Sequence, residues 1–321
     1  MIGEIGGSRI SASRALYIKL GEGNCWARLA LDSGTLRFGF RDFPHNEALT
    51  AVESNNFTVA KSFYENELSV NPGTATRYSN ELREFYTAGA DVLWITFFEG
   101  RLWWAFSDPQ VYAAEDATSA VTGSRYRSTV GGWSDKNIAG EVLWKNSLRG
   151  SLTTTEGFRG AVCKVREFEY LLRRLNNEET DQTKAVREAR ANLVAQLSPL
   201  VAGLHWKDFE LLVELVITQG GWRRVSATGG VQHTTDLEVE LPLTGERALV
   251  QVKSRIDNRI AKQALEKLVA DAGGSRIFLV YHTQDETLSL SQENVTLIGP
   301  ESLAEKVVDA GLSTWVMNKV G

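Results

Sequence analysis

Two short apolar segments in the last third of the chain constrain its fold most strongly. Thr235–Val239 and Ala248–Ser254 are rich in β-branched and aliphatic residues and are joined by a stretch containing Pro, Thr and Gly. This pattern predicts two adjacent β-strands. The first segment carries Asp236 near its start, and the second ends in Gln251-x-Lys253.

The alternation of side chains along a strand places these polar residues. Gln251 and Lys253 are two positions apart and share one face, which we expect to meet Asp236, whereas Val250 and Val252 point into the core. An acid on one strand facing an amide and a lysine on the next is typical of a metal-dependent phosphodiesterase. The acid binds Mg²⁺, and the lysine offsets the charge that develops in the transition state.

Neighbouring residues modify this expectation. Asp236, Glu238 and Glu240 occupy every second position of the strand, so the three acids share one face. That face either binds a cation or is simply exposed to solvent. Gln251 is uncharged, which reduces the negative charge available for a second cation. We therefore expect at most one tightly held metal ion, with Asp236 as its ligand.

Residues 199–321 resemble the Mrr-like restriction endonucleases of the PD-(D/E)xK superfamily, in the variant where Gln replaces an acidic residue. The motifs that carry the resemblance are His205–Val213 with its Phe-Glu pair, Gly220–Trp222, the Asp236 and Gln251-x-Lys253 strands, Arg276–Val280, and Val295–Ala304. The loop before Asp236 is longer than is usual in the family, because Val231–Thr235 separates the acid from Gly229-Gly230.

This resemblance implies a catalytic set and its cofactor. Asp236, Gln251, Lys253 and Glu210 form the catalytic group, and Glu210 contacts the metal through water or holds the lysine. The backbone carbonyl of Val252 is a further metal ligand. Mg²⁺ is the implied ion, and Mn²⁺ can substitute for it.

Composition bounds the class of protein. At 321 residues the chain is long enough for two domains. Its net charge is −5, and residues 199–321 hold 12 Lys and Arg against 16 Asp and Glu, so DNA binding must depend on a local patch. Candidates close to the motif in sequence are Arg223, Arg224, Arg255, Arg259 and Lys262, and solvated surface charges are the alternative; we assign Arg255 to substrate binding.

Other features argue against several classes. We find no signal peptide and no apolar run long enough to span a bilayer. The two cysteines lie far apart in sequence, which favours a reduced, cytoplasmic protein. Zinc-site spacings, the phosphate-binding GxxxxGK[ST] loop and the GxSxG elbow do not occur, so no nucleotide cofactor is expected.

Residues 1–163 read as a mostly β domain. Strands are predicted at Leu16–Leu20, Cys25–Leu31, Thr35–Phe40, Asp91–Phe98, Arg101–Phe106, Arg125–Val130, Gly140–Trp144 and Gly160–Val165, with helices at Asn46–Phe57 and Tyr78–Thr87. Hairpin turns are expected at Asp32–Gly34 and Glu99-Gly100. Strands this short and numerous favour a small barrel.

The N-terminal segment holds six of the nine tryptophans. The pattern of Trp26, Gly34–Phe40, Gly89–Trp94 and Gly100–Ala105 resembles PUA-superfamily domains of the EVE/YTH type. The resemblance implies a reader domain in which an aromatic pocket takes up a modified base, flipped out of the duplex. We name Trp26, Trp103 and Trp133 as substrate-binding candidates; the alternative is that these rings fill the core.

Residues 164–198 read as a helical connector, because charged residues and good helix formers predominate there. From Trp206 onward the predicted order is helix, three strands, helix, two strands, helix. This order favours a central mixed sheet flanked by helices, as in restriction endonucleases.

Together these observations predict a Mg²⁺-dependent DNA endonuclease that is modification-dependent, with a reader domain at 1–163 and a nuclease domain at 199–321. Its partner is double-stranded DNA, and a homodimer is expected because one site cuts one strand. Two alternatives remain open. One is a restriction endonuclease that reads unmodified sequence, and the other is a nucleic-acid-binding protein that has lost catalytic activity.

Overall fold

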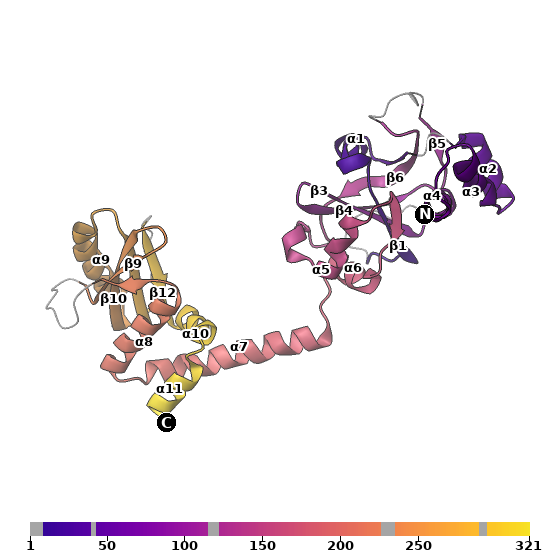
Figure 1. Ribbon diagram of the computed structural model, residues 1–321. Coiled ribbons are helices and arrows are strands. Elements are labelled where there is room, and N and C mark those ends of the chain that lie inside the picture. Colours follow the sequence, from indigo (N-terminus) through magenta and orange to yellow (C-terminus); the bar gives the residue numbers. More distant parts are fainter. Residues whose placement is uncertain (1–8, 40–42, 115–121, 226–234, 289–293) are drawn as a thin grey trace. The chain divides into compact units, whose positions relative to one another are not determined.

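The computed structural model describes residues 9–39, 43–114, 122–225, 235–288 and 294–321. The chain divides into two compact units, Met1–Glu179 and Thr180–Gly321, called here the front and rear units (Figure 1). Their boundary lies inside the stretch expected to be a connector, whose two helices are divided between the units.

The front unit is built on one mixed sheet. Its strands are β1 (Arg14–Ile18), β2 (Thr35–Phe38), β3 (Val92–Phe98), β4 (Arg101–Ser107), β5 (Tyr112–Ala113), β6 (Arg125–Ser134) and β7 (Val162–Lys164). The order is β2-β6-β4-β3-β1-β7, with β5 paired to β6. Strands β1 and β3 are parallel, and β1 and β7 antiparallel.

Among the described residues this sheet does not close into the predicted small barrel, because β2 and β7 are its two ends. The burial of β1 and β3 explains the difference. Leu16 and Trp94 belong to one apolar cluster, whereas Tyr17 and Leu93 belong to another. A sheet buried on both faces needs a layer on each side, whereas a small barrel has a single interior.

Helices provide those layers. They are α1 (Ala27–Asp32), α2 (His45–Glu53), α3 (Thr58–Asn66), α4 (Pro72–Thr87), α5 (Gly150–Thr153) and α6 (Phe168–Leu175), with short 3-10 turns η1 (Glu22–Asn24), η2 (Lys145–Ser147) and η3 (Thr154–Gly157). Residues of α1 to α4 pack in the first cluster and residues of α5 and α6 in the second.

Three local predictions in the front unit are wrong. Cys25–Leu31 is not a strand, since Ala27–Asp32 forms helix α1, and its Ala, Arg and Leu residues are strong helix formers. The hairpin expected at Asp32–Gly34 does not form either, because these residues connect α1 to β2, which pairs with β6. Gly140–Trp144 makes only isolated bridges to Lys136 and Arg101. The hairpin at Glu99-Gly100 is confirmed: both residues have positive φ, of 49° and 71°, which suits the tight turn between β3 and β4.

Part of the arginine content of the front unit is structural. Arg127 on β6 is fully buried and donates to the carbonyls of Asp108, Phe85 and Ala88 at 2.8, 3.0 and 2.7 Å. Burial lowers its pKa to about 10, so it remains charged at neutral pH. Arg125 is buried on the same strand. Neither residue is available to contact DNA phosphates.

The rear unit contains a five-stranded sheet in the order β12-β11-β10-β9-β8. Its strands are β8 (Arg223–Arg224), β9 (Leu237–Leu241), β10 (Glu246–Ile256), β11 (Arg276–Gln284) and β12 (Val295–Ile298). Strands β10, β11 and β12 are parallel, whereas β8, β9 and β10 pair antiparallel. The sheet is therefore mixed, as predicted.

Helices cover both faces of this sheet (Figure 1). They are α7 (Asp181–Ala202), α8 (Trp206–Gln219), α9 (Asn258–Ala272), α10 (Pro300–Asp309) and α11 (Ser313–Val320). The apolar side of α8 packs with residues of α7, α10 and α11 on one face, and α9 packs on the other. No helix in the described part of the chain is long and apolar enough to cross a membrane.

A buried acid joins helix α4 to strand β7 in the front unit. Glu81 is 2% exposed, and its carboxylate accepts the backbone N–H of Ala161 at 2.9 Å. Burial raises its pKa, and the charge of Arg77 opposes that shift. A Cβ built on Gly160 would clash with Oε1 of Glu81 and with the ring of Phe158, so a larger residue at this position would have to displace them.

We predict that Gly160→Ala destabilises the front unit by about 1–3 kcal/mol, the usual cost of overpacking a close contact. Gly150→Ala is the matched control, because a Cβ there meets nothing within 4 Å. Thermal unfolding followed by circular dichroism measures both. Equal melting temperatures for the two variants would contradict the packing described here.

Candidate active site

Asp236 lies immediately before β9 and is fixed by backbone bonds to β10. Its N–H donates to the carbonyl of Val250 at 3.1 Å. The hydroxyl of Thr235 donates to the same carbonyl at 3.0 Å. These contacts hold Asp236 at the point where β9 and β10 begin to pair. Its carboxylate therefore reaches the next two residues of β10.

The Asp236 carboxylate meets Gln251 and Val252. Its Oδ2 accepts the backbone N–H of Val252 at 2.6 Å and the side-chain amide of Gln251. Val250 and Val252 are buried in the apolar cluster shared with α8, so Gln251 and Lys253 occupy the opposite face of β10. The structure thus brings Asp236 and Gln251 together and leaves Lys253 on the same face.

Glu210 reaches this region from helix α8. Phe209 anchors the helix in the core, and the next residue, Glu210, lines a cavity of about 200 Å³ together with Asp236 and Val252. Partial burial raises the pKa of Glu210, and the negative charge of Asp236 raises it further. The positive charge of Lys253 lowers it, so both charged groups of the strands act on this helical acid.

The other two acids of the β9 face have a cationic partner. Arg247 lies 3.2 Å from Glu240 and 3.8 Å from Glu238. Opposite charge on the neighbouring strand relieves the repulsion along this face. Of the three alternating acids, Asp236 is the one that lines the cavity with Glu210.

Two carboxylates and their surroundings form the available metal-binding group. Within the described ranges no group of three or more His, Cys, Asp and Glu residues gathers as a metal site. Mg²⁺, however, commonly uses only one or two carboxylates and keeps several waters. The repulsion between Asp236 and Glu210, seen in the raised pKa of Glu210, is what a cation between them would relieve. The donor set therefore fits one hard cation.

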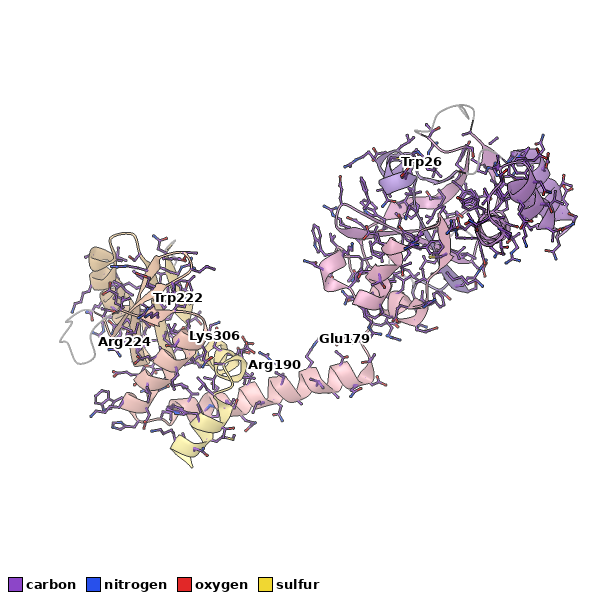
Figure 2. The ribbon with its side chains drawn as sticks, in the orientation of Figure 1. Trp26, Glu179, Arg190, Trp222, Arg224 and Lys306 are labelled. Atoms are coloured by element: carbon purple, nitrogen blue, oxygen red, sulfur yellow. The ribbon has the colours of Figure 1, made fainter. Side chains whose placement is uncertain are left out.

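Sequence reasoning missed two charged residues of this cavity, Lys207 and Glu214, and named Arg224 only as a candidate phosphate contact. Lys207 lies one helical turn before Glu210 on α8, and its charge also lowers the pKa of Glu210. Arg224 and Glu214 line the same cavity and form an ion pair at 2.9 Å. Figure 2 shows Arg224 with its neighbour Trp222 in the rear unit. The three-residue spacing of Lys207 and Glu210 on a helix was the signal available in the sequence.

The predicted contact residue Arg255 is exposed near the end of β10. It forms an ion pair with Asp285 at 3.3 Å, and both side chains are well exposed. A phosphate would compete with this carboxylate for the guanidinium. The loop containing Gly229-Gly230 lies outside the described residues.

The three tryptophans named as pocket candidates are half-buried in the front unit. Trp133 belongs to β6 and not to a loop, and its indole N–H donates to the carbonyl of Thr35 at 3.0 Å. Trp103 donates to the carbonyl of Phe98 at 3.3 Å. These bonds tie the polar edge of each ring to the protein's own backbone.

Trp26 lies in a slot made of glycines, next to helix α1 (Figure 2). Built Cβ atoms on Gly21, Gly39 and Gly123 would lie 2.7, 3.3 and 3.2 Å from its ring. Close packing on these sides holds the ring in place and covers much of it. Trp26 and Trp133 both pack against the first apolar cluster of the front unit.

Residues 201–288 match the model of the Mrr_cat family, described as restriction endonuclease. This match lies within the rear unit and includes Glu210, Asp236, Gln251 and Lys253. No curated protein matches the chain. A solved structure, that of MspJI restriction endonuclease in complex with a 27-mer oligonucleotide, aligns with 77% of this chain and 69% of its own, at 13% identity and a TM-score of 0.27. A PUA-like front domain finds no match in these comparisons.

The opposing effects of Asp236 and Lys253 on Glu210 predict opposite shifts. In metal-free protein, Asp236→Asn lowers the pKa of Glu210, because a negative neighbour is removed, and Lys253→Ala raises it, because a positive neighbour is removed. Carboxyl-carbon NMR titration measures both. Shifts of the same sign in the two variants would show that these groups do not surround Glu210.

Proposed function

We propose that this protein is a divalent-metal-dependent DNA endonuclease whose front unit selects DNA that carries a modified base. The nuclease proposal is supported by Asp236, which contacts Gln251 and lines a cavity with Glu210, and by the charge of Lys253 acting on Glu210. These residues lie in the segment that matches the restriction endonuclease family. An acid, an amide and a lysine arranged in this way match the requirements of phosphodiester hydrolysis.

The proposed reaction adds water to phosphorus and breaks one phosphorus–oxygen bond of the DNA backbone. Asp236, Glu210 and the carbonyl of Val252 are the proposed ligands of Mg²⁺, for which Mn²⁺ can substitute. A bound divalent ion supplies Lewis-acid chemistry, polarising the phosphate and lowering the pKa of water.

The protein's own groups position the reactants. Lys253 is half-buried at the end of the Gln251 face, where its ammonium group can donate to the attacking water and to the charged phosphate oxygens. Gln251 and the N–H of Val252 hold the Asp236 carboxylate in one orientation. A fixed carboxylate preserves the geometry of the site without reorganisation during the reaction.

The reader role of the front unit rests on its aromatic content. A base stacked on an aromatic ring gains enough to offset much of the cost of leaving the duplex. Cleavage of both strands needs two catalytic centres, and we therefore propose a homodimer on duplex DNA.

Plasmid digestion tests the proposal directly. Wild-type protein with Mg²⁺ is expected to cut plasmid containing 5-methylcytosine or 5-hydroxymethylcytosine and to leave unmodified plasmid intact. Lys253→Ala should reduce the cleavage rate by about a hundredfold or more, the usual loss when one electrostatic stabiliser is removed. Lys306→Ala, at an exposed position on α10, is the matched control.

Each result has a distinct meaning. Cleavage of both plasmids would favour an enzyme that reads unmodified sequence. If the wild type and Lys253→Ala are equally inactive with Mg²⁺ and Mn²⁺ on all substrates, the rear unit is a binding module and not a nuclease.

Lys207 offers a second test, because it adds a positive charge to the cavity lined by Glu210 and Asp236. We predict that it contacts a DNA phosphate. Lys207→Gln should raise KM and reduce the slope of log K against log salt by about one. The kcat value at saturating DNA should change by less than about threefold. A large fall in kcat with an unchanged salt slope would instead assign Lys207 to the chemical step.

A further inference from the structure

Trp144 differs from the other described tryptophans of the front unit in its exposure. It is 47% exposed. Trp94 and Trp104 are buried, and Trp26, Trp103 and Trp133 are half-buried. About half of this ring is therefore accessible to a ligand.

An arginine fixes the orientation of this ring. The guanidinium carbon of Arg101 lies 4.8 Å from the centroid of Trp144, within the range of a cation–π contact. Arg101 is itself held by Asp135 at 2.7 Å. The backbone adds to this support, because Arg101 and Trp144 form a β-bridge and Lys145 donates to the carbonyl of Gly100 at 2.8 Å. The ring is therefore pre-organised.

A cavity of about 600 Å³ lies beside the ring. Gly100, Lys145, Asn146, Leu148 and Thr153 line it together with Trp144. Arg101, which contacts the ring, is not among the described residues that line the cavity. The lining combines an apolar wall, Leu148, with an amide and a hydroxyl from Asn146 and Thr153. Such a combination suits a planar ring with a polar edge.

We infer that Trp144 is the stacking platform for a nucleobase of DNA, and that the cavity beside it receives that base. The inference rests on the proposed function in taking DNA as the partner. It replaces Trp26, Trp103 and Trp133 as base-contacting residues with one exposed ring. Stacking accepts any base, so Asn146 and Thr153 are the groups placed to read the polar edge.

The proposed ligand is a nucleobase attached to a phosphate backbone, and two kinds of DNA can supply it. One is a base in single-stranded DNA and the other is a base turned out of a duplex. Lys145 and Arg149 flank the ring in sequence, and each is already paired, with Glu156 and Glu167 respectively. Their charges are partly neutralised, so affinity should depend on the ring more than on salt.

The test is equilibrium binding by the full-length chain in EDTA, which prevents cleavage. The probes are fluorescently labelled single-stranded 12-mers and 12-base-pair duplexes, each with or without one 5-methylcytosine. We expect Trp144→Ala to weaken binding of the single strand and of the modified duplex by about tenfold, which corresponds to about 1.4 kcal/mol. Trp144→Phe, which keeps a stacking ring, should stay within about threefold of wild type.

Tyr112→Ala is the matched control in the same unit. Tyr112 is 41% exposed, but its ring is stacked on Tyr126 with centroids 5.4 Å apart. Its removal should leave affinity unchanged. Loss confined to the modified duplex identifies a flipped base as the source, whereas equal loss for single strands identifies any unpaired base.

Three outcomes would overturn the inference: wild-type affinity in Trp144→Ala, an equal loss in Tyr112→Ala, or no binding of any probe by the wild type. Plasmid cleavage separates this failure from that of the nuclease proposal. If Trp144→Ala binds and cuts like the wild type, the base site is wrong and the nuclease stands. If the wild type cuts nothing but binds through Trp144, the base site stands alone.

Discussion

The bonds from Gln251 and from the Val252 N–H to the Asp236 carboxylate are the contacts on which the candidate active site depends. They join the residue that precedes β9 to the strand that carries Lys253. A carboxylate that accepts two donors on one oxygen is held in a single orientation, and its second oxygen remains directed elsewhere. Because the same strand positions the lysine, any shift of β10 against β9 would disturb both groups at once.

The remaining site residues come from a different layer of the rear unit. Glu210 and Lys207 lie on α8, which is anchored by Phe209 and the apolar residues that follow it. The exposed side of the helix carries the acidic Glu210 and the cationic Lys207 one turn apart. The pKa of Glu210 depends on Asp236, which precedes β9, and on Lys253 in β10. A titration of Glu210 therefore shows whether these groups are in place around it.

Much of the rear unit could be predicted from sequence, because its patterns are local. The alternation around Val250 and Val252, the apolar face of α8 and the strand order each follow from residue periodicity. The pairing of Asp236 with Gln251 followed from strand alternation alone. The ion pairs of Glu238 and Glu240 with Arg247 did not, since they depend on the register between β9 and β10.

The front unit shows where such reasoning stops. Cys25–Leu31 is predicted to be a strand before a turn, yet Ala27–Asp32 forms a helix whose buried alanines pack in the first apolar cluster. Which tryptophan is exposed, and which arginine is buried, depends on packing between distant segments. In sequence, nothing separated the buried Arg127 from the exposed Arg255. Likewise, nothing separated the exposed Trp144 from the half-buried Trp26.

The contact between Glu81 and Gly160 also has a bearing on how this protein can diverge. A lineage that keeps the acid at position 81 can acquire a side chain at position 160 only if the carboxylate moves, because it fills that space. Relatives that replace the acid with a smaller residue are released from the restriction. The two positions should therefore covary across homologues, leaving a record of the joint between α4 and β7 even where overall similarity has faded.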